Sequence, residues 1–219
     1  YRTLTGNQTG ALLVEYILSS KKAKGTLPEN GVVIKTIVTT ELAAAIAHSY
    51  GIEIMNVLTG FKYIGEKMTE FAKTGDHTYL IGFEESYGYG VVATMLIAEM
   101  AAYYKTKGKS LYEALMDIYK KYGYYSEKTV SFVMPGKDGM EKMSQLLTDL
   151  RQTPPTKVAG LPTSNVLYYD LSDDAWLCVR PSGTEPKIKL YLGTFAESFE
   201  TAEKTIEKVL EDCKKQLGL

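Results

Sequence analysis

The hydrophobic positions in the first half of the chain change period repeatedly, which predicts alternating strands and helices. Apolar segments rich in β-branched residues predict strands at 32–39, 52–58 and 78–83. Apolar residues at helical spacing predict helices at 10–18, 39–51, 63–75, 91–108 and 110–123. Because strand and helix alternate through residues 1–122, we predict a layered α/β domain with a mostly parallel sheet.

From about Tyr124 the order of elements changes. Strands are predicted at 129–134, 165–171, 175–179 and 187–193, the last three joined by short turns. Amphipathic helices are predicted at 138–151 and from Phe199 to Leu217. Three successive strands flanked by two helices predict a smaller α+β domain with an antiparallel sheet. The predicted domains are therefore 1–122 and 123–219.

The composition limits the classes of partner. A formal charge of -1 and a pI near 6.2 give no overall field that would gather nucleic acid or an anionic membrane, so any anion site must be local. The N-terminus lacks a signal-peptide layout, and Glu99 interrupts the longest apolar stretch, so we expect no membrane span. Two cysteines and two histidines fit neither a disulfide framework nor a metal site. We expect a cytoplasmic protein in which this chain ligates no metal.

Polar residues follow each predicted strand of the first domain. They are Thr39 and Thr40, then Thr59, Gly60 and Lys62, then Glu84, Glu85 and Ser86. The carboxyl ends of parallel strands meet at one edge of a sheet, where helix N-termini also point. Each residue alone has an ordinary explanation as a helix cap, a solvated turn or a first helical turn. Together, hydroxyls, a lysine and a carboxylate pair favour a polyhydroxylated, phosphorylated ligand.

The loop RPSGTEPK, at 180–187, connects two predicted strands. For such a connection it is unusually rich in groups that bind anions. An arginine fork, two hydroxyls and a glycine amide come from Arg180, Ser182, Gly183 and Thr184. Such groups can surround one phosphate, and the two prolines reduce the entropy lost on binding. The alternative is a rigid hairpin in which Arg180 pairs with a nearby carboxylate such as Glu185.

Four segments then identify a resemblance: TGNQTGALL, TGFK, FEESYGY and RPSGTEPK. Their order and approximate spacing resemble the third and fourth domains of the α-D-phosphohexomutases, closest to the bacterial phosphoglucomutase branch, over essentially the whole chain. The resemblance implies an intramolecular phosphotransferase, an isomerase that interconverts hexose 1-phosphate and hexose 6-phosphate. A phosphoserine enzyme and a hexose 1,6-bisphosphate intermediate belong to that reaction.

The resemblance also implies roles for residues. Glu84 and Ser86 would hold the sugar hydroxyls, and Thr59, Gly60 and Lys62 would line the same cleft. Lys62 is a candidate assisting residue, acting electrostatically or as a proton donor. The loop at 180–187, the phosphate loop, would bind the phosphate that is not reacting, through Arg180, Ser182, Gly183 and Thr184.

The sequence departs from the family pattern in three respects. The family's first two domains are absent, and with them the phosphoserine loop and the aspartate-rich loop that binds Mg²⁺. We therefore expect this chain alone to be inactive and to bind neither group, with hexose phosphate and the N-terminal domains of the same polypeptide as its partners. Tyr87 stands where some members have a histidine, and the usual charged stretch does not follow Tyr89.

Two alternatives remain open at this stage. The first is a stand-alone sugar-phosphate binding module without catalysis. The second is a related mutase with phosphomannomutase or phosphopentomutase specificity, since in the family the sugar loop, here Glu84–Ser86, contacts hydroxyls that several sugars share.

Overall fold

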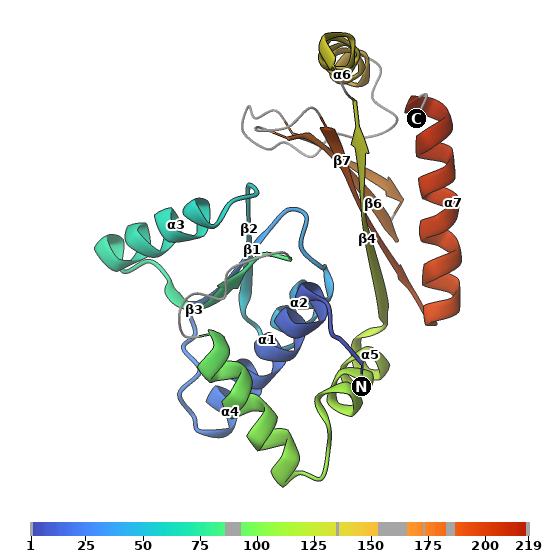
Figure 1. The fold of residues 1–219 in the computed structure, drawn as a ribbon. Coiled ribbons are helices and arrows are strands. Elements are labelled where there is room, and N and C mark those ends of the chain that lie inside the picture. Colours follow the sequence, from blue (N-terminus) through green and yellow to red (C-terminus); the bar gives the residue numbers. More distant parts are fainter. Residues whose placement is uncertain are drawn as a thin grey trace. The chain divides into compact units, whose positions relative to one another are not determined.

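The computed structural model describes residues 2–85, 93–134, 136–152, 166–172, 174–182 and 187–217 (Figure 1). Within these ranges, the side chains at 137, 140, 216 and 217 are not described. The chain divides into two compact units, Tyr1–Gly123 and Tyr124–Leu219. Among the helices described, none combines the length and the apolar character that crossing a membrane requires.

The first unit is a parallel three-stranded sheet covered by helices on both faces. Its elements are α1 (Gly6–Ala23), β1 (Gly31–Thr36), α2 (Leu42–Ser49), β2 (Glu53–Val57), α3 (Phe61–Thr74), β3 (Thr78–Phe83), α4 (Ala93–Thr106) and α5 (Leu111–Tyr122). The strand order is β2-β1-β3, and β1 pairs in parallel with both neighbours. This confirms the predicted layered, mostly parallel α/β domain.

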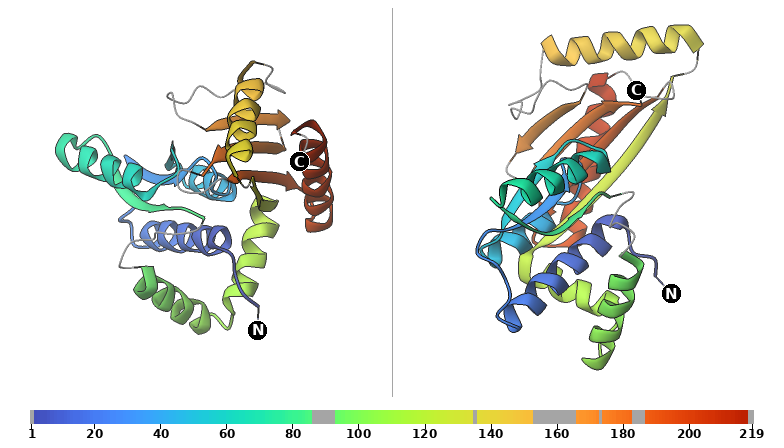
Figure 2. Two further views of the ribbon diagram at one scale, coloured as in Figure 1. Left: turned by 45° about the horizontal axis from the view of Figure 1, so that its top comes forward. Right: turned by 90° about the vertical axis from the view of Figure 1, so that its left-hand side faces the viewer.

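Alternate residues of the sheet face different helices. Ile34 of β1 packs with Ile64 and Phe71 of α3, while the ring of Phe83 lies against Gly10 of α1. Figure 2 shows α3 and α1 on opposite sides of the sheet. Because β1 is the central strand and is buried along its whole length, it has a continuous apolar run rather than an alternating one.

Several boundaries in this unit differ from the prediction, among them the following three. Helix α1 begins at Gly6 rather than Gly10, because Thr5 and Gln8 form a capping box that the apolar pattern does not reveal. Strand β1 ends at Thr36 rather than residue 39, where the N–H of Thr39 turns back to the carbonyl of Thr36. Helix α3 begins at Phe61, two residues before its predicted start at residue 63.

The second unit is an antiparallel sheet with two helices packed on it. Its elements are β4 (Tyr124–Val133), α6 (Gly136–Gln152), β5 (Leu167–Ser172), β6 (Ala175–Pro181), β7 (Lys187–Ala196) and α7 (Phe199–Leu217), and the strand order is β4-β7-β6-β5. Leu147 of α6 and Ile206 of α7 share one core with alternate residues of β6 and β7, including Val179. This confirms the predicted α+β fold with an antiparallel sheet.

Strand β4 is longer than predicted, since it starts at Tyr124 rather than Thr129. Its first part, YYSE, has no strand-like alternation of apolar and polar residues. It becomes a strand by pairing with the far end of β7, where Tyr125 opposes Phe195. A long-range partner therefore decides this boundary.

Candidate functional site

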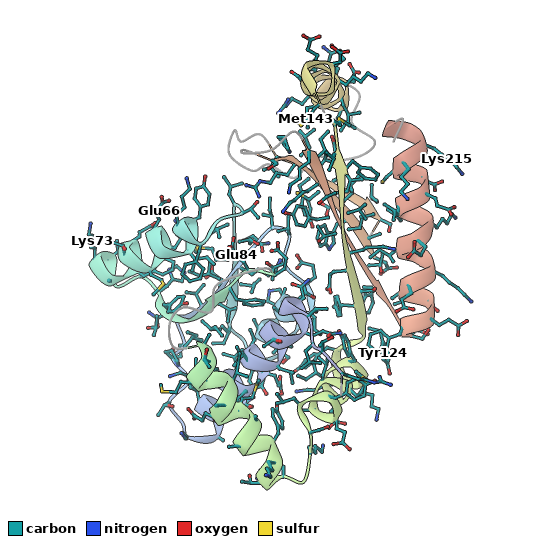
Figure 3. The ribbon with its side chains drawn as sticks, viewed as in Figure 1. Glu66, Lys73, Glu84, Tyr124, Met143 and Lys215 are labelled. Carbon is teal, nitrogen blue, oxygen red and sulfur yellow. The ribbon has the colours of Figure 1, made fainter. Side chains whose placement is uncertain are left out.

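The loops that follow β2 and β3 meet at the carboxyl edge of the parallel sheet. The backbone N–H of Gly60 donates a hydrogen bond of 2.5 Å to the carboxylate of Glu84. Glu84 lies directly after β3 (Figure 3). Its exposed fraction is only 9%. Since β2 and β3 flank β1, this bond joins the two outer strands across the end of the central one. The structure thus brings together two of the residues that the sequence assigned to a sugar site.

Thr59 and Lys62 are close to Gly60 in the sequence. The hydroxyl oxygen of Thr59 is buried and has no hydrogen-bond partner among the described residues. Lys62 is exposed in the first turn of α3, with its ammonium 4.7 Å from the ring centre of Tyr63. The residue before this helix, Gly60, has a φ of 128°, a value that disfavours residues with a Cβ. The start of α3 therefore combines a buried hydroxyl, an exposed lysine and helix N-terminal amides around Gly60, the residue that contacts Glu84.

The start of α1 approaches the other side of the same edge. A Cβ placed on Gly6 would lie 1.8 Å from the carbonyl oxygen of Glu85, so the helix reaches β3 only because this position is glycine. The buried side chain of Asn7 accepts a hydrogen bond of 3.2 Å from the N–H of Thr40. The segment TGNQTG thus packs α1 against the ends of β1 and β3. The residue pattern gave no role to Gly6 or Asn7, because their partners are distant in sequence.

The phosphate loop extends from the end of β6 in the second unit. Arg180 is half-buried and lies opposite Lys189 of β7 in the strand register. The N–H of Ser182 donates to the carbonyl of Lys187 at 2.8 Å, which closes the base of the loop. Like charges facing each other across two strands are unfavourable without a counter-charge. No ion pair of Arg180 or Lys189 is found in the part of the chain that the structure describes.

Some predicted site residues lie outside the described residues. They are Ser86 of the sugar loop and Gly183 and Thr184 of the phosphate loop. Glu185, the alternative partner of Arg180, also lies outside them.

A metal centre finds no support among the side chains described. The ranges given above contain no group of three or more His, Cys, Asp or Glu that could hold a metal ion. None of the described residues is therefore assigned to Mg²⁺.

Comparison with known proteins identifies the family of this chain. The family model of the phosphoglucomutase/phosphomannomutase alpha/beta/alpha domain III matches residues 5–122, and that of the phosphoglucomutase/phosphomannomutase C-terminal domain matches residues 134–211. The chain is 30% identical to a phosphoglucomutase of Staphylococcus haemolyticus over 237 residues, which cover 92% of this chain and 42% of the relative. It is 31% identical to a phosphoglucomutase of Staphylococcus aureus (strain bovine RF122 / ET3-1) over 242 residues, with 94% and 42% covered. The chain thus spans about 42% of the length of these curated relatives.

Solved structures share the fold. The open form of pp63/parafusin, a phosphoglucomutase from Paramecium, aligns with a TM-score of 0.72 at 16% identity, covering 98% of this chain and 41% of that one. A phosphoglucomutase/phosphomannomutase family protein from Burkholderia thailandensis aligns with a TM-score of 0.64 at 16% identity, covering 99% and 43%. With both halves matched in order, the chain belongs to the phosphoglucomutase/phosphomannomutase family, of which it carries domain III and the C-terminal domain.

Proposed function

We propose that this chain is the C-terminal part of a cytoplasmic phosphoglucomutase, and that it supplies the sugar-binding and distal phosphate-binding groups of that enzyme. The observation that carries the proposal is the bond between Gly60 and Glu84, which gathers the polar ends of β2 and β3 at one edge of the sheet. Hexose phosphates need hydroxyl-binding carboxylates and a local anion site, and the family provides both.

Glu84 is the proposed sugar-binding carboxylate, together with Ser86. One carboxylate oxygen receives the Gly60 N–H, which fixes the side chain in a single orientation before substrate arrives. An ionised carboxylate has further acceptor sites, so it can accept sugar hydroxyls at the same time. Thr59 and Lys62, from the same segment as Gly60, supply a hydroxyl and a cation in this proposal.

Arg180 is the proposed phosphate fork, completed by Ser182, Gly183 and Thr184. Arg180 and Lys189 lie opposite each other in neighbouring strands, which supports this assignment. A bound phosphate dianion would offset the repulsion between the two cations. A bisphosphate that must turn over during the reaction needs a grip that accepts either phosphate. A fork and hydroxyls recognise phosphate alone, whichever sugar carbon bears it.

The reacting phosphoryl group belongs, in this proposal, to a serine on the N-terminal domains, where Mg²⁺ is also held. The serine's phosphoryl group passes to the free hydroxyl of the hexose phosphate and gives a bisphosphate. The other phosphoryl group then returns to the serine. This chain orients the sugar during both transfers, and orientation can account for a large part of the rate.

Turnover of the full-length protein tests the proposal. Glucose 1-phosphate, mannose 1-phosphate and ribose 1-phosphate are offered in parallel, and we expect glucose 1-phosphate to be the best substrate. Glu84→Gln, which keeps an acceptor for the Gly60 N–H but removes the charge, should lower turnover while the enzyme's serine is still phosphorylated. Glu66→Gln is the matched control, because Glu66 is exposed on α3 (Figure 3).

Other results would contradict the proposal. Equal loss of turnover and of serine phosphorylation in Glu84→Gln would argue against a sugar-specific role. Tight binding of hexose phosphate by a full-length protein without any turnover would instead favour a binding module.

A further inference from the structure

Lys35 is a buried lysine in the middle of the parallel sheet. It belongs to β1, the central strand, and its side chain is 0% exposed. In the register it lies opposite Phe83, whose ring packs against α1, so Lys35 faces the same side. An ammonium removed from water is costly unless it is paired, and an apolar side chain would suit this position better. We therefore expect this lysine to have a role other than packing in the core.

Both hydrogen-bond partners of Lys35 lie in the connection between β1 and α2. Its ammonium donates to the carbonyl oxygen of Thr39 at 3.0 Å and to the carboxylate of Glu41 at 2.7 Å. The Glu41 side chain is 36% exposed, so its carboxylate is also hydrated. Lys35 thus links strand β1 to the loop that follows it and does not link two elements of the core.

The same connection is held at two further points. The hydroxyls of Thr36 and Thr39 lie 2.8 Å apart, and the N–H of Thr39 bonds to the carbonyl of Thr36 at 3.0 Å. The N–H of Thr40 donates to Asn7 of α1. These bonds make the chain turn immediately after β1, although its apolar residues continue to Val38.

The turn after β1 leaves room for a hydrogen bond that crosses the end of this strand. Neighbouring strands lie about 4.8 Å apart, so the outer strands β2 and β3 are separated by roughly 10 Å. The hydrogen bond between Gly60 and Glu84 spans this gap at the carboxyl edge. It can form only if the chain leaving β1 does not occupy the space between the two outer loops.

We propose that Lys35 is a positioning residue for the sugar-binding edge: by holding Thr39 and Glu41 it keeps the connection after β1 turned away, so that Glu84 reaches Gly60. The role of this edge in sugar binding rests on the proposed function, whereas the effect of Lys35 on the Gly60–Glu84 bond does not. Lys35 acts through Glu84 and does not touch the substrate.

Hydrogen exchange of the Gly60 amide tests the structural step without reference to activity. In the full-length protein, Lys35→Met should speed exchange of this amide roughly tenfold or more, because its acceptor is no longer held in place. Lys109→Met is the matched control, since Lys109 forms an exposed pair with Asp117 in the same unit. The control should leave Gly60 exchange unchanged. Unchanged exchange in Lys35→Met would overturn the proposal.

Kinetics test the consequence for the reaction. Lys35→Met should lower kcat/KM for glucose 1-phosphate by roughly 10- to 100-fold, the usual effect of a misplaced binding group. The thermal midpoint should change little, because methionine suits the buried site and Glu41, the carboxylate that loses its partner, is 36% exposed and stays hydrated. In a Glu84→Gln background, Lys35→Met should cause little further loss. If the losses in kcat/KM of the two single variants multiply in the double variant, Lys35 has a merely structural role. The same follows if kcat/KM and the thermal midpoint of Lys35→Met fall together.

A second variant covers the case in which Lys35→Met does not fold. Glu41→Gln keeps the ammonium but gives it a neutral acceptor at a partly exposed position, and it should speed Gly60 exchange by a smaller factor. No change in that variant would also overturn the role of Lys35. If Glu84→Gln itself leaves turnover intact while Gly60 exchange responds to Lys35→Met, the proposed function fails and the positioning role stands.

Discussion

Replacing Gly6 by alanine perturbs the contact between α1 and the end of β3. The added Cβ would lie 1.8 Å from the carbonyl oxygen of Glu85 and 2.7 Å from its carbonyl carbon. Both are backbone atoms, so neither can rotate away as a side chain would. The start of α1 and the residues after β3 must therefore move apart, which also disturbs the neighbouring Glu84.

The magnitude follows from two opposing effects. Forcing extra volume into a packed contact typically costs about 1–3 kcal/mol. Alanine is favoured over glycine in a helix by roughly 0.5–1 kcal/mol, and less at its first residue. We therefore expect Gly6→Ala to lower the free energy of unfolding by about 1–2 kcal/mol.

Gly65→Ala provides a matched control in the same unit. Gly65 lies inside α3, and a Cβ there would meet no atom within 4 Å. Only the helix-propensity effect remains, so this variant should be more stable than the parent by roughly 0.5–1 kcal/mol. The two alanine variants should thus differ by about 2 kcal/mol.

Urea denaturation followed by two probes measures this difference. Far-ultraviolet circular dichroism reports helices of both units, while the single tryptophan, Trp176, reports the second unit through its fluorescence. Two probes are needed because two compact units need not unfold in one transition. If Gly6→Ala proved as stable as Gly65→Ala, the close approach of α1 to Glu85 would be refuted.

Three further predictions concern other parts of the chain. Arg180→Ala should abolish calorimetric binding of a hexose bisphosphate, because the phosphate fork is lost, and an unchanged titration would refute the assignment. Burial, followed by the hydrogen bond to Glu99, raises the pKa of Tyr16 from 10.0 to about 12. The contribution of Tyr16 to stability is present below pH 10.0 and is lost as the pH rises through about 12, since the tyrosine of the unfolded state ionises first. Tyr16→Phe should therefore lessen the loss of stability at alkaline pH. An identical loss in the variant would contradict the raised pKa of Tyr16. Gly193→Ala would place a Cβ 2.2 Å from the indole nitrogen of Trp176, so a shifted fluorescence spectrum is expected and an unshifted one would contradict the packing.

The fold class could be predicted because each element carries its own periodic signal. The amphipathic stripe from Phe199 to Leu217 becomes α7, and the apolar strands become a parallel and an antiparallel sheet. Where the signal is not periodic, the boundaries were wrong. Gly6 enters α1 through a capping box, and Tyr124 enters β4 through its pairing with β7.

The candidate site could be predicted only in part. The strand-end rule selected Thr59, Gly60 and Glu84, and the structure brings Gly60 and Glu84 into contact. It did not select Lys35, although a lysine within a continuous apolar strand was a visible signal. Gly6 gave no signal of its own, because glycine is common in turns and its close partner is Glu85.

The sequence by itself determined which residues have side chains suited to a sugar phosphate. They are Lys62 after the second strand, Glu84 and Glu85 after the third, and the loop RPSGTEPK in the second unit. Only the tertiary structure decided which of them meet. The strand order β2-β1-β3 places Glu84 across the end of β1 from Gly60, and it buries Lys35 in the central strand. The physical reason is that periodicity is a local property of the backbone, whereas strand order depends on packing between segments far apart in the chain.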